Sequence, residues 1–259
     1  MSDDEQLPPK PESEKPNSTF SQPAELLPRP LVPVGTRIRE TWLTRRPSTE
    51  SIFIAAIATL ALVIGSVLGW SHPALAATRH AVFEQGEWWR AWTTIFVHAD
   101  AAHLASNSML FFIFAFFLFG HFGFLVFPLA AFLFGGIANF LVLSSYAPDV
   151  RLVGASGVVY WCGGTWLVLY YFLSRQKNLK HRIVRTLGVA ILLFAPAETF
   201  QPNISHETHF AGFALGCLFG TSLYFVNRKK YLSAEVHETI FEEQDEPLDD
   251  LPGPEGFKP

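Results

Sequence analysis

The chain has 259 residues, of which 49% are hydrophobic and only 16% are charged, and its formal net charge at pH 7 is −4. Its basic residues occur in short clusters rather than in one broad patch, so we do not expect nucleic acid as a partner. The apolar residues gather in long runs, and this composition is typical of a membrane protein.

The two ends of the chain differ from the part between them. Residues 1–47 and 231–259 are rich in proline and polar residues, and such segments bury too little apolar surface to offset the entropy lost on ordering. We predict a disordered cytoplasmic Pro-rich tail over 1–47, a membrane domain over 48–230 and an acidic disordered cytoplasmic tail over 231–259.

Six apolar stretches lie between these tails. Each is close to the roughly 20 residues that a helix needs to cross about 30 Å of hydrocarbon. Backbone groups in lipid must be hydrogen-bonded within the chain, and runs of this length favour helices over barrel strands. We therefore predict an all-α membrane protein, a bundle of six transmembrane helices at residues 52–70, 103–120, 122–146, 154–173, 183–200 and 209–226.

The distribution of lysine and arginine in the connecting segments predicts the orientation of the bundle. Cytoplasmic loops carry an excess of these residues. Twelve lie on one side and three on the other: Arg37, Arg39, Arg45, Arg46, Arg175, Lys177, Lys180, Arg182, Arg185, Arg228, Lys229 and Lys230 against Arg79, Arg90 and Arg151. Both termini are therefore expected in the cytoplasm, and spans two, four and six are expected to begin at the outer face.

Polar residues interrupt the apolar pattern at or just before the start of each even-numbered span. They are His98, His103 and Asn107 near the second span, Ser156 on the fourth and His209 on the sixth. Ionisable residues inside a membrane are energetically unfavourable, and they are functional candidates by default. The sequence therefore predicts one polar site near the outer face, with a nucleophile, a base and further hydrogen-bond donors.

Helical periodicity indicates how close these side chains come. At about 100° per residue, Ser156 and Tyr160 share one stripe of the fourth span, and Gly157 lies at its edge. Gly157 is expected to allow tight packing beside Ser156, because small residues let two membrane helices approach closely. On the sixth span one face carries His209, Gly212, Gly216 and Gly220.

Three motifs together resemble the rhomboid family of intramembrane serine proteases. They are H-x4-H-x3-N from His98 to Asn107, G-A-S-G at 154–157 with Tyr160 four residues after the serine, and H-x2-G-x3-G from His209 to Gly216. Each motif alone is weak, but their order and their positions on the spans make the combination specific. The resemblance covers residues 52 to about 226.

The resemblance implies a role for each polar residue. Ser156 would be the nucleophile and His209 the general base of a dyad. Asn107 and His103 share a helical face and would stabilise the oxyanion, and Tyr160 would orient the imidazole of His209. The alternatives are a serine that bonds to its own helix, polar contacts between helices and an ordinary buried tyrosine.

The predicted activity is endopeptidase cleavage of transmembrane protein substrates near the outer face of a lipid bilayer, without a cofactor. A catalytically inactive scaffold of the same fold is the main alternative, but a scaffold would need neither Ser156 nor His209. A small transporter would show paired charges within the spans.

A zinc site is a further alternative, because His98, His103, His206 and His209 are expected on one side of the bundle. However, H-E-T-H differs from the H-E-x-x-H zinc helix, and no carboxylate or cysteine completes a ligand set. We therefore predict no metal. The six-span plan, with no transit peptide at the N-terminus, favours a bacterial plasma membrane.

Overall fold

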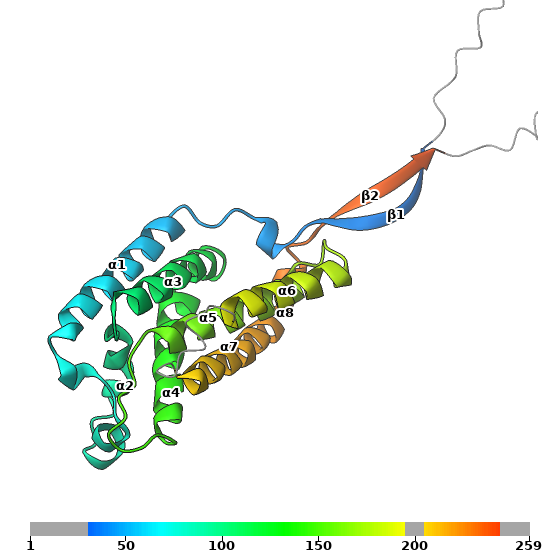
Figure 1. Ribbon diagram of the computed structural model, residues 1–259. Helices are drawn as coiled ribbons and strands as arrows, with labels where there is room; N and C mark the ends of the chain where they lie inside the picture. Colours follow the sequence, from blue (N-terminus) through cyan, green and yellow to red (C-terminus); the bar gives the residue numbers. More distant parts are fainter. Residues whose placement is uncertain (1–30, 195–204, 244–259) are drawn as a thin grey trace, which may run out of the picture. The chain divides into compact units, whose positions relative to one another are not determined.

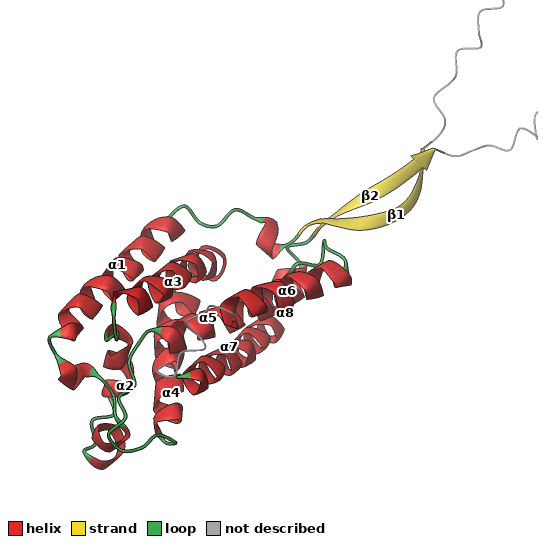
Figure 2. Ribbon diagram, viewed as in Figure 1, coloured by secondary structure: helices red, strands yellow, loops and turns green. Residues whose placement is uncertain are grey.

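The computed structural model describes residues 31–194 and 205–243, and these are mostly helical (Figure 1, Figure 2). The long helices are α1 (Ser51–Trp70), α3 (Ala101–Phe122), α4 (Ala131–Leu143), α5 (Ser156–Leu173), α6 (Leu179–Phe194) and α7 (His206–Val226). The shorter helical segments are η1 (Trp42–Thr44), η2 (Pro73–Leu75), η3 (His80–Glu84), α2 (Arg90–Thr93), η4 (Thr94–Phe96), η5 (Leu125–Ala130) and α8 (Arg228–Leu232).

Each of the six predicted spans overlaps one long helix. Among the described residues, four stretches are long and apolar enough to cross a membrane: α1, α3, Leu125–Leu143 and α7. The predicted fifth span, 183–200, begins later than α6 does, and its last residues, 195–200, lie outside the described residues.

The predicted third span, 122–146, is not one continuous helix. Gly123, with φ of 77°, ends α3, and Phe127 has an extended backbone with φ −134° and ψ 128° inside η5. The residue before a proline is driven out of the helical region by a clash with the proline ring, and Pro128 follows Phe127. Regular helix therefore resumes only at α4.

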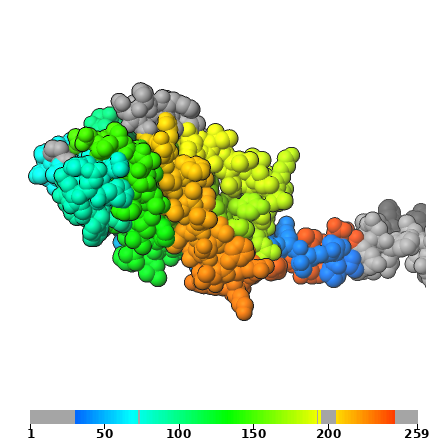
Figure 3. Space-filling model, turned by 90° about the horizontal axis from the view of Figure 1, so that it is seen from below, coloured from blue at the N-terminus to red at the C-terminus, as the bar shows by residue number. Residues whose placement is uncertain are grey.

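Helix α5 lies at the centre of the bundle, where it contacts α3, α4, α6 and α7. Its contact with α7 is made through glycines on both helices. A Cβ atom at Gly164 would lie 2.4 Å from the Phe213 carbonyl oxygen, and one at Gly216 would lie 2.1 Å from the Trp161 carbonyl oxygen. The two backbones therefore touch, as the spacing of small residues predicts. On the surface, α7 lies beside α4 (Figure 3).

Strands β1 (Leu31–Glu40) and β2 (Val236–Glu243) pair in a two-stranded sheet (Figure 1). The Arg37 guanidinium lies 2.8 Å from the Glu238 carboxylate. Both strands fall within the ranges 1–47 and 231–259, so the expectation of disorder does not hold for these residues. A strand partner about 200 residues away leaves no local signal in the sequence.

The compact unit that contains the helices runs from Thr36 to Glu238, which is longer than the predicted domain of 48–230. Its N-terminal extension packs on the helices, because the Trp42 indole N–H donates to the His121 carbonyl at 2.9 Å. Residues 1–30 and 244–259 of the predicted tails lie outside the described residues.

Candidate active site

Ser156 is the first residue of α5 and follows a turn that requires glycine. Gly154 has φ of 116°, a conformation that residues with a Cβ atom rarely adopt. A Cβ at this position would also lie 2.9 Å from Cε1 of His103. Gly154 thus turns the chain into α5 and leaves room for the imidazole, and Ser156 is buried at the start of the helix.

The segment that leads to Ser156 is held on its other side by the first loop. Leu152 pairs with Ala77 in an antiparallel bridge, and the Gly154 N–H donates to the Thr94 carbonyl at 3.2 Å. The hydroxyl of Thr94, a fully buried residue, donates to the Leu152 carbonyl. The first loop therefore fixes the entry into α5.

His209 lies on the first turn of α7. Ser205 is the N-cap of this helix: its hydroxyl accepts from the Thr208 N–H at 3.1 Å, and its carbonyl accepts from the His209 N–H at 3.3 Å. The imidazole stacks on the Tyr160 ring, with centroids 4.0 Å apart and planes inclined by 12°. The Tyr160 hydroxyl donates to the Leu193 carbonyl at 2.8 Å, so α6 holds the ring on which His209 rests.

The backbones of α5 and α7 are in contact next to these side chains. A Cβ at Gly212, three residues after His209, would lie 2.4 Å from the carbonyl oxygen of Gly157, which follows Ser156. A Cβ at Gly157 would lie 3.0 Å from Oδ1 of Asn139 on α4. Neither glycine tolerates a side chain without a shift of the backbone or of its neighbours, so this contact fixes the spacing of residues 156 and 209.

Ser156, His209 and His103 line one cavity of about 610 Å³. The structure thus brings together the nucleophile, base and donor types that the sequence placed on three different spans. The rest of the lining comes from the segment after α4 and from the start of α7: Ser145, Tyr146, Ala147, Val150, Arg151, Leu152, Val153, Ser205, His206 and Glu207.

Asn107 approaches the same turn from α3. Its Nδ2 would lie 3.7 Å from a Cβ placed on Gly154, on which His103 also closes. The side chain is buried, and Nδ2 has no hydrogen-bond partner among residues 31–194 and 205–243. A buried donor without a partner typically costs about 1–3 kcal/mol, so this amide is available to an incoming acceptor.

His98 braces the loop before α3 and is not among the residues that line the cavity. Its Nδ1 lies 2.9 Å from the Ser66 hydroxyl on α1, and its Nε2 accepts from the Ala155 N–H at 3.3 Å. Because the Ser66 hydroxyl already donates to the Leu62 carbonyl, we assign the imidazole proton to Nδ1. Burial, and next the charge of His103, lower the pKa of His98 to about 4.

A further hydrogen-bond network at this cavity was missed by the sequence analysis. The Tyr146 hydroxyl donates to Ser205 Oγ and lies 3.4 Å from Oε2 of Glu207. Ser205 Oγ is also 2.6 Å from the Thr208 hydroxyl. The segment after α4 is thereby tied to the N-cap of α7, one turn before His209. The serine three residues before Thr208 was a local sign of the cap, but nothing in the pattern indicated Tyr146.

The described residues contain no cluster of three or more His, Cys, Asp or Glu side chains that could hold a metal ion. Within the same residues, the buried Nδ1 of His209 has no hydrogen-bond partner. A carboxylate bonded to this nitrogen, as in a Ser-His-Asp triad, is therefore absent from the described part of the chain.

Comparison with known proteins identifies relatives of this chain. The model of the rhomboid domain matches residues 85–225, from the first loop to the end of α7. Over 153 residues the chain is 32% identical to the rhomboid protease GluP of Bacillus subtilis (strain 168), which covers 58% of this chain and 29% of GluP. Over 134 residues it is 33% identical to the "Putative rhomboid protease YdcA" of the same organism, which covers 51% of this chain and 66% of that protein.

Proposed function

We propose, because the chain belongs to the rhomboid family, that it is a serine endopeptidase that cleaves peptide bonds in or beside transmembrane helices of other proteins. One observation carries most of this proposal. The contact between Gly157 and Gly212 holds a serine on α5 and a histidine on α7 at one shared cavity. An inactive scaffold of the same fold would gain nothing from this arrangement.

In the proposed mechanism, the Ser156 hydroxyl attacks the carbonyl carbon of the scissile peptide bond while His209 takes its proton. The C–N bond then breaks, and His209 returns the proton to the leaving amine. Water, deprotonated by the same imidazole, releases the acyl group from Ser156 and restores the free hydroxyl. Tyr160 acts as a positioning residue, because its stacked ring limits rotation of the imidazole.

The oxyanion formed in each step needs donors that are in place before the reaction. We assign this role to Asn107 and His103, which converge on Gly154 two residues before Ser156. The buried Nδ2 of Asn107 has no partner among the described residues, and an oxyanion would give it one. Loss of one such donor typically lowers the catalytic rate by about 10²- to 10³-fold.

The membrane arrangement belongs to the same proposal. We infer six spans with both termini in the cytoplasm, which puts the cavity near the outer face. Helix α5 then spans the membrane inside a shell of other helices, and α6 spans it at the edge of the bundle. Transmembrane proteins would be the substrates, and a bacterial plasma membrane would be the location, in keeping with the bacterial relatives.

The test uses the full chain in detergent, a serine-directed fluorophosphonate probe and a reporter substrate with one transmembrane segment. We expect the probe to label wild type at Ser156, with no labelling of Ser156→Ala and little of His209→Ala. Both substitutions should lower substrate cleavage by about 10⁴-fold or more, because the two residues act as a unit.

Ser145→Ala is the matched control, because Ser145 lines the same cavity but its hydroxyl donates to the Val142 carbonyl. This variant should be labelled and should cleave like wild type. Equal cleavage by wild type and Ser156→Ala would refute the proposal. If folded wild type neither reacts with the probe nor cleaves any reporter, the inactive scaffold becomes the better account.

A further inference from the structure

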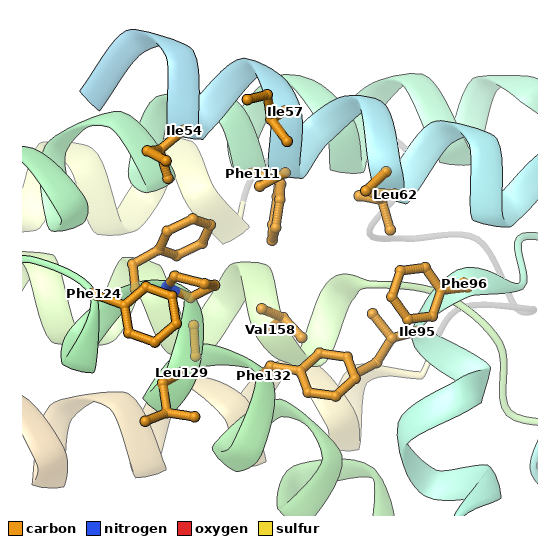
Figure 4. Close-up of a pocket in the computed structure, with 15 residues that line it drawn as sticks. Ile54, Ile57, Leu62, Ile95, Phe96, Phe111, Phe124, Leu129, Phe132 and Val158 are labelled. Atoms are coloured by element: carbon orange, nitrogen blue, oxygen red, sulfur yellow. The ribbon is translucent and has the colours of Figure 1, made fainter. Parts of the chain in front are cut away.

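A second cavity, of about 460 Å³, lies away from the polar site and is lined only by apolar residues (Figure 4). Its floor is protein interior: Leu62, Ile95 and Phe127 are each at most 2% exposed. Its rim is open, with Ile57 exposed by 64% and Leu129 by 51%. The cavity is therefore a groove that enters the bundle from the surface, rather than a sealed void.

The groove is elongated along α1. Ile54 and Leu62 mark its two ends on this helix, and eight residues correspond to about 12 Å at 1.5 Å per residue. Phe124 and Phe132 line the opposite side, from the segment that the extended backbone at Phe127 interrupts (Figure 4). The groove thus runs parallel to a helix that is long enough to cross a membrane.

The surroundings of the groove narrow down what fills it. Its walls belong mainly to α1 and Leu125–Leu143, two stretches with the length and composition of membrane spans, so its mouth opens into hydrocarbon. Water has no polar partner there and does not occupy such a site.

An empty groove would also be unfavourable, because its lining atoms would lose their dispersion contacts. We propose that this groove is a binding site for one acyl chain of a bilayer phospholipid, lying along α1. The chain is contacted from several sides by buried side chains, whereas ordinary boundary lipid touches only the outer surface. The site should therefore retain its chain longer than the exposed faces of the bundle do.

The groove also reaches the helix that carries Ser156. Val158, two residues further along α5, lines it, and a Cβ placed on Gly135 of α4 would lie 2.2 Å from Val158 Cγ2. A bound acyl chain would therefore complete the packing behind the first turn of α5. This inference goes beyond the proposed protease activity and does not depend on it.

The test is photo-crosslinking of the full chain in phosphatidylcholine vesicles doped with a lipid that carries a diazirine in its acyl chain. Peptide mass spectrometry locates the labels. Labelling at Ala58, Ala61 and Leu129 should exceed labelling at Phe210 and Leu218, two exposed apolar residues of α7, by about fivefold, which corresponds to roughly 1 kcal/mol. The Ser156→Ala variant should give the same pattern.

Ala61→Phe fills the groove and should lower this labelling to the level of α7. Ala56→Phe, on an exposed part of the same helix outside the groove, should leave it unchanged. Thermal unfolding of both variants shows whether they fold, and the wild-type pattern is decisive without either. Equal labelling of the groove and α7 would mean boundary lipid only and would overturn the proposal.

Two competition arms identify the source of the chain. Excess unlabelled phosphatidylcholine should reduce labelling in the groove, whereas an equal amount of free fatty acid should reduce it less. Stronger competition by the fatty acid would contradict a phospholipid site. A single-span peptide that blocks labelling better than either lipid would also overturn the proposal, because the occupant would then be a protein helix.

Discussion

Helix α5 is enclosed by protein, whereas helix α1 is exposed along most of its length. Every residue from Ser156 to Thr165 is buried, but only five residues of α1 are: Ser51, Ala55, Leu62, Ser66 and Gly69. The mean hydropathy of α1 is 2.5, whereas α5 is not among the described stretches that are apolar enough to count as spans. The difference in mean hydropathy follows from the surroundings of the two helices. A helix inside the bundle needs small and polar residues for its contacts with other helices, whereas an exposed helix does not.

The two helices also differ in how they make contact. Helix α5 meets α7 backbone to backbone, with no space for a methyl group at Gly164 or Gly216. Helix α1 has one such close approach, at Gly69, where a Cβ would lie 2.6 Å from the Phe96 carbonyl oxygen, but it leaves a groove beside Phe96 and Phe132. The backbone contact of α5 with α7 holds two side chains in a fixed relation, whereas the groove beside α1 leaves room for another molecule.

The largest effect should come from adding a methyl group at the backbone contact. Gly216→Ala would put a Cβ 2.1 Å from the Trp161 carbonyl oxygen, and we expect a loss of about 4 kcal/mol or more in the free energy of unfolding. Gly188→Ala on α6 is the control, because a Cβ there meets nothing within 4 Å. It should stabilise the helix by about 0.5–1 kcal/mol. Similar stabilities of the two variants in detergent would show that the contact is not tight.

The next largest effect should be a dependence of stability on pH through His98. This residue links α1 to α5, because it contacts Ser66 on α1 and the Ala155 N–H just before α5. Its folded pKa of about 4 is below the ordinary 6.5, so the unfolded chain binds more protons between these values. The contribution of neutral His98 to the free energy of unfolding is therefore fully present above pH 6.5. It is lost as the pH drops towards 4, and the loss is on the order of 3 kcal/mol.

Thermal unfolding of wild type and His98→Gln across this pH range checks the prediction. The variant should be less stable at pH 7 but should depend less on pH, because glutamine does not titrate. His72→Gln, which replaces an exposed histidine, should keep the wild-type slope. The neighbours His103 and Asp100 also act on His98. An unchanged slope in His98→Gln would therefore assign the acid sensitivity to another group.

The smallest effect should come from the hydrogen bond that joins the segment after α4 to the start of α7. Tyr146→Phe removes one hydrogen bond to Ser205 and should lower stability by about 1 kcal/mol. The N-cap bond of Thr208 stays, so labelling of Ser156 by the serine-directed probe should slow by only about fivefold.

Ser205→Ala removes both the tie and the cap, and should lose about 1 kcal/mol more. The double variant should lose less than the sum, because Tyr146 and Ser205 share one bond. Tyr171→Phe, at a tyrosine outside the cavity, is the control. Additive losses would show that the two side chains act separately.

The long helices were the most predictable part of the fold. The ends of an apolar run can be read directly from the sequence. Helix α1, for example, begins one residue before the predicted residue 52 and ends at the predicted residue 70. The break at Phe127 was not predicted although Pro128 is visible in the sequence, because the flanking run is uniformly apolar. The sheet of β1 and β2 was missed because its pairing depends on a partner remote in the sequence.

The candidate site shows the same division. Because the even-numbered spans were expected to begin at the outer face, Ser156, His209 and His103 were predicted to lie at one depth. The structure puts all three at one cavity, while their chemical roles stay predictions. The stack of Tyr160 on His209 followed from the family resemblance. The contact of Tyr146 with α7 joins two loop ends, and loop ends have no periodicity from which a contact can be read.

The small sheet of β1 and β2 constrains how the chain threads a membrane. Hydrogen-bonded strands cannot lie on opposite sides of a bilayer, so every path from residue 40 to residue 236 must return to the side on which it began. The number of crossings between them is therefore even. If α1, α3, Leu125–Leu143 and α7 all cross, then α5 and α6 either both cross or both do not. A five-span arrangement, in which only one of this pair traverses the lipid, would pull the two strands apart.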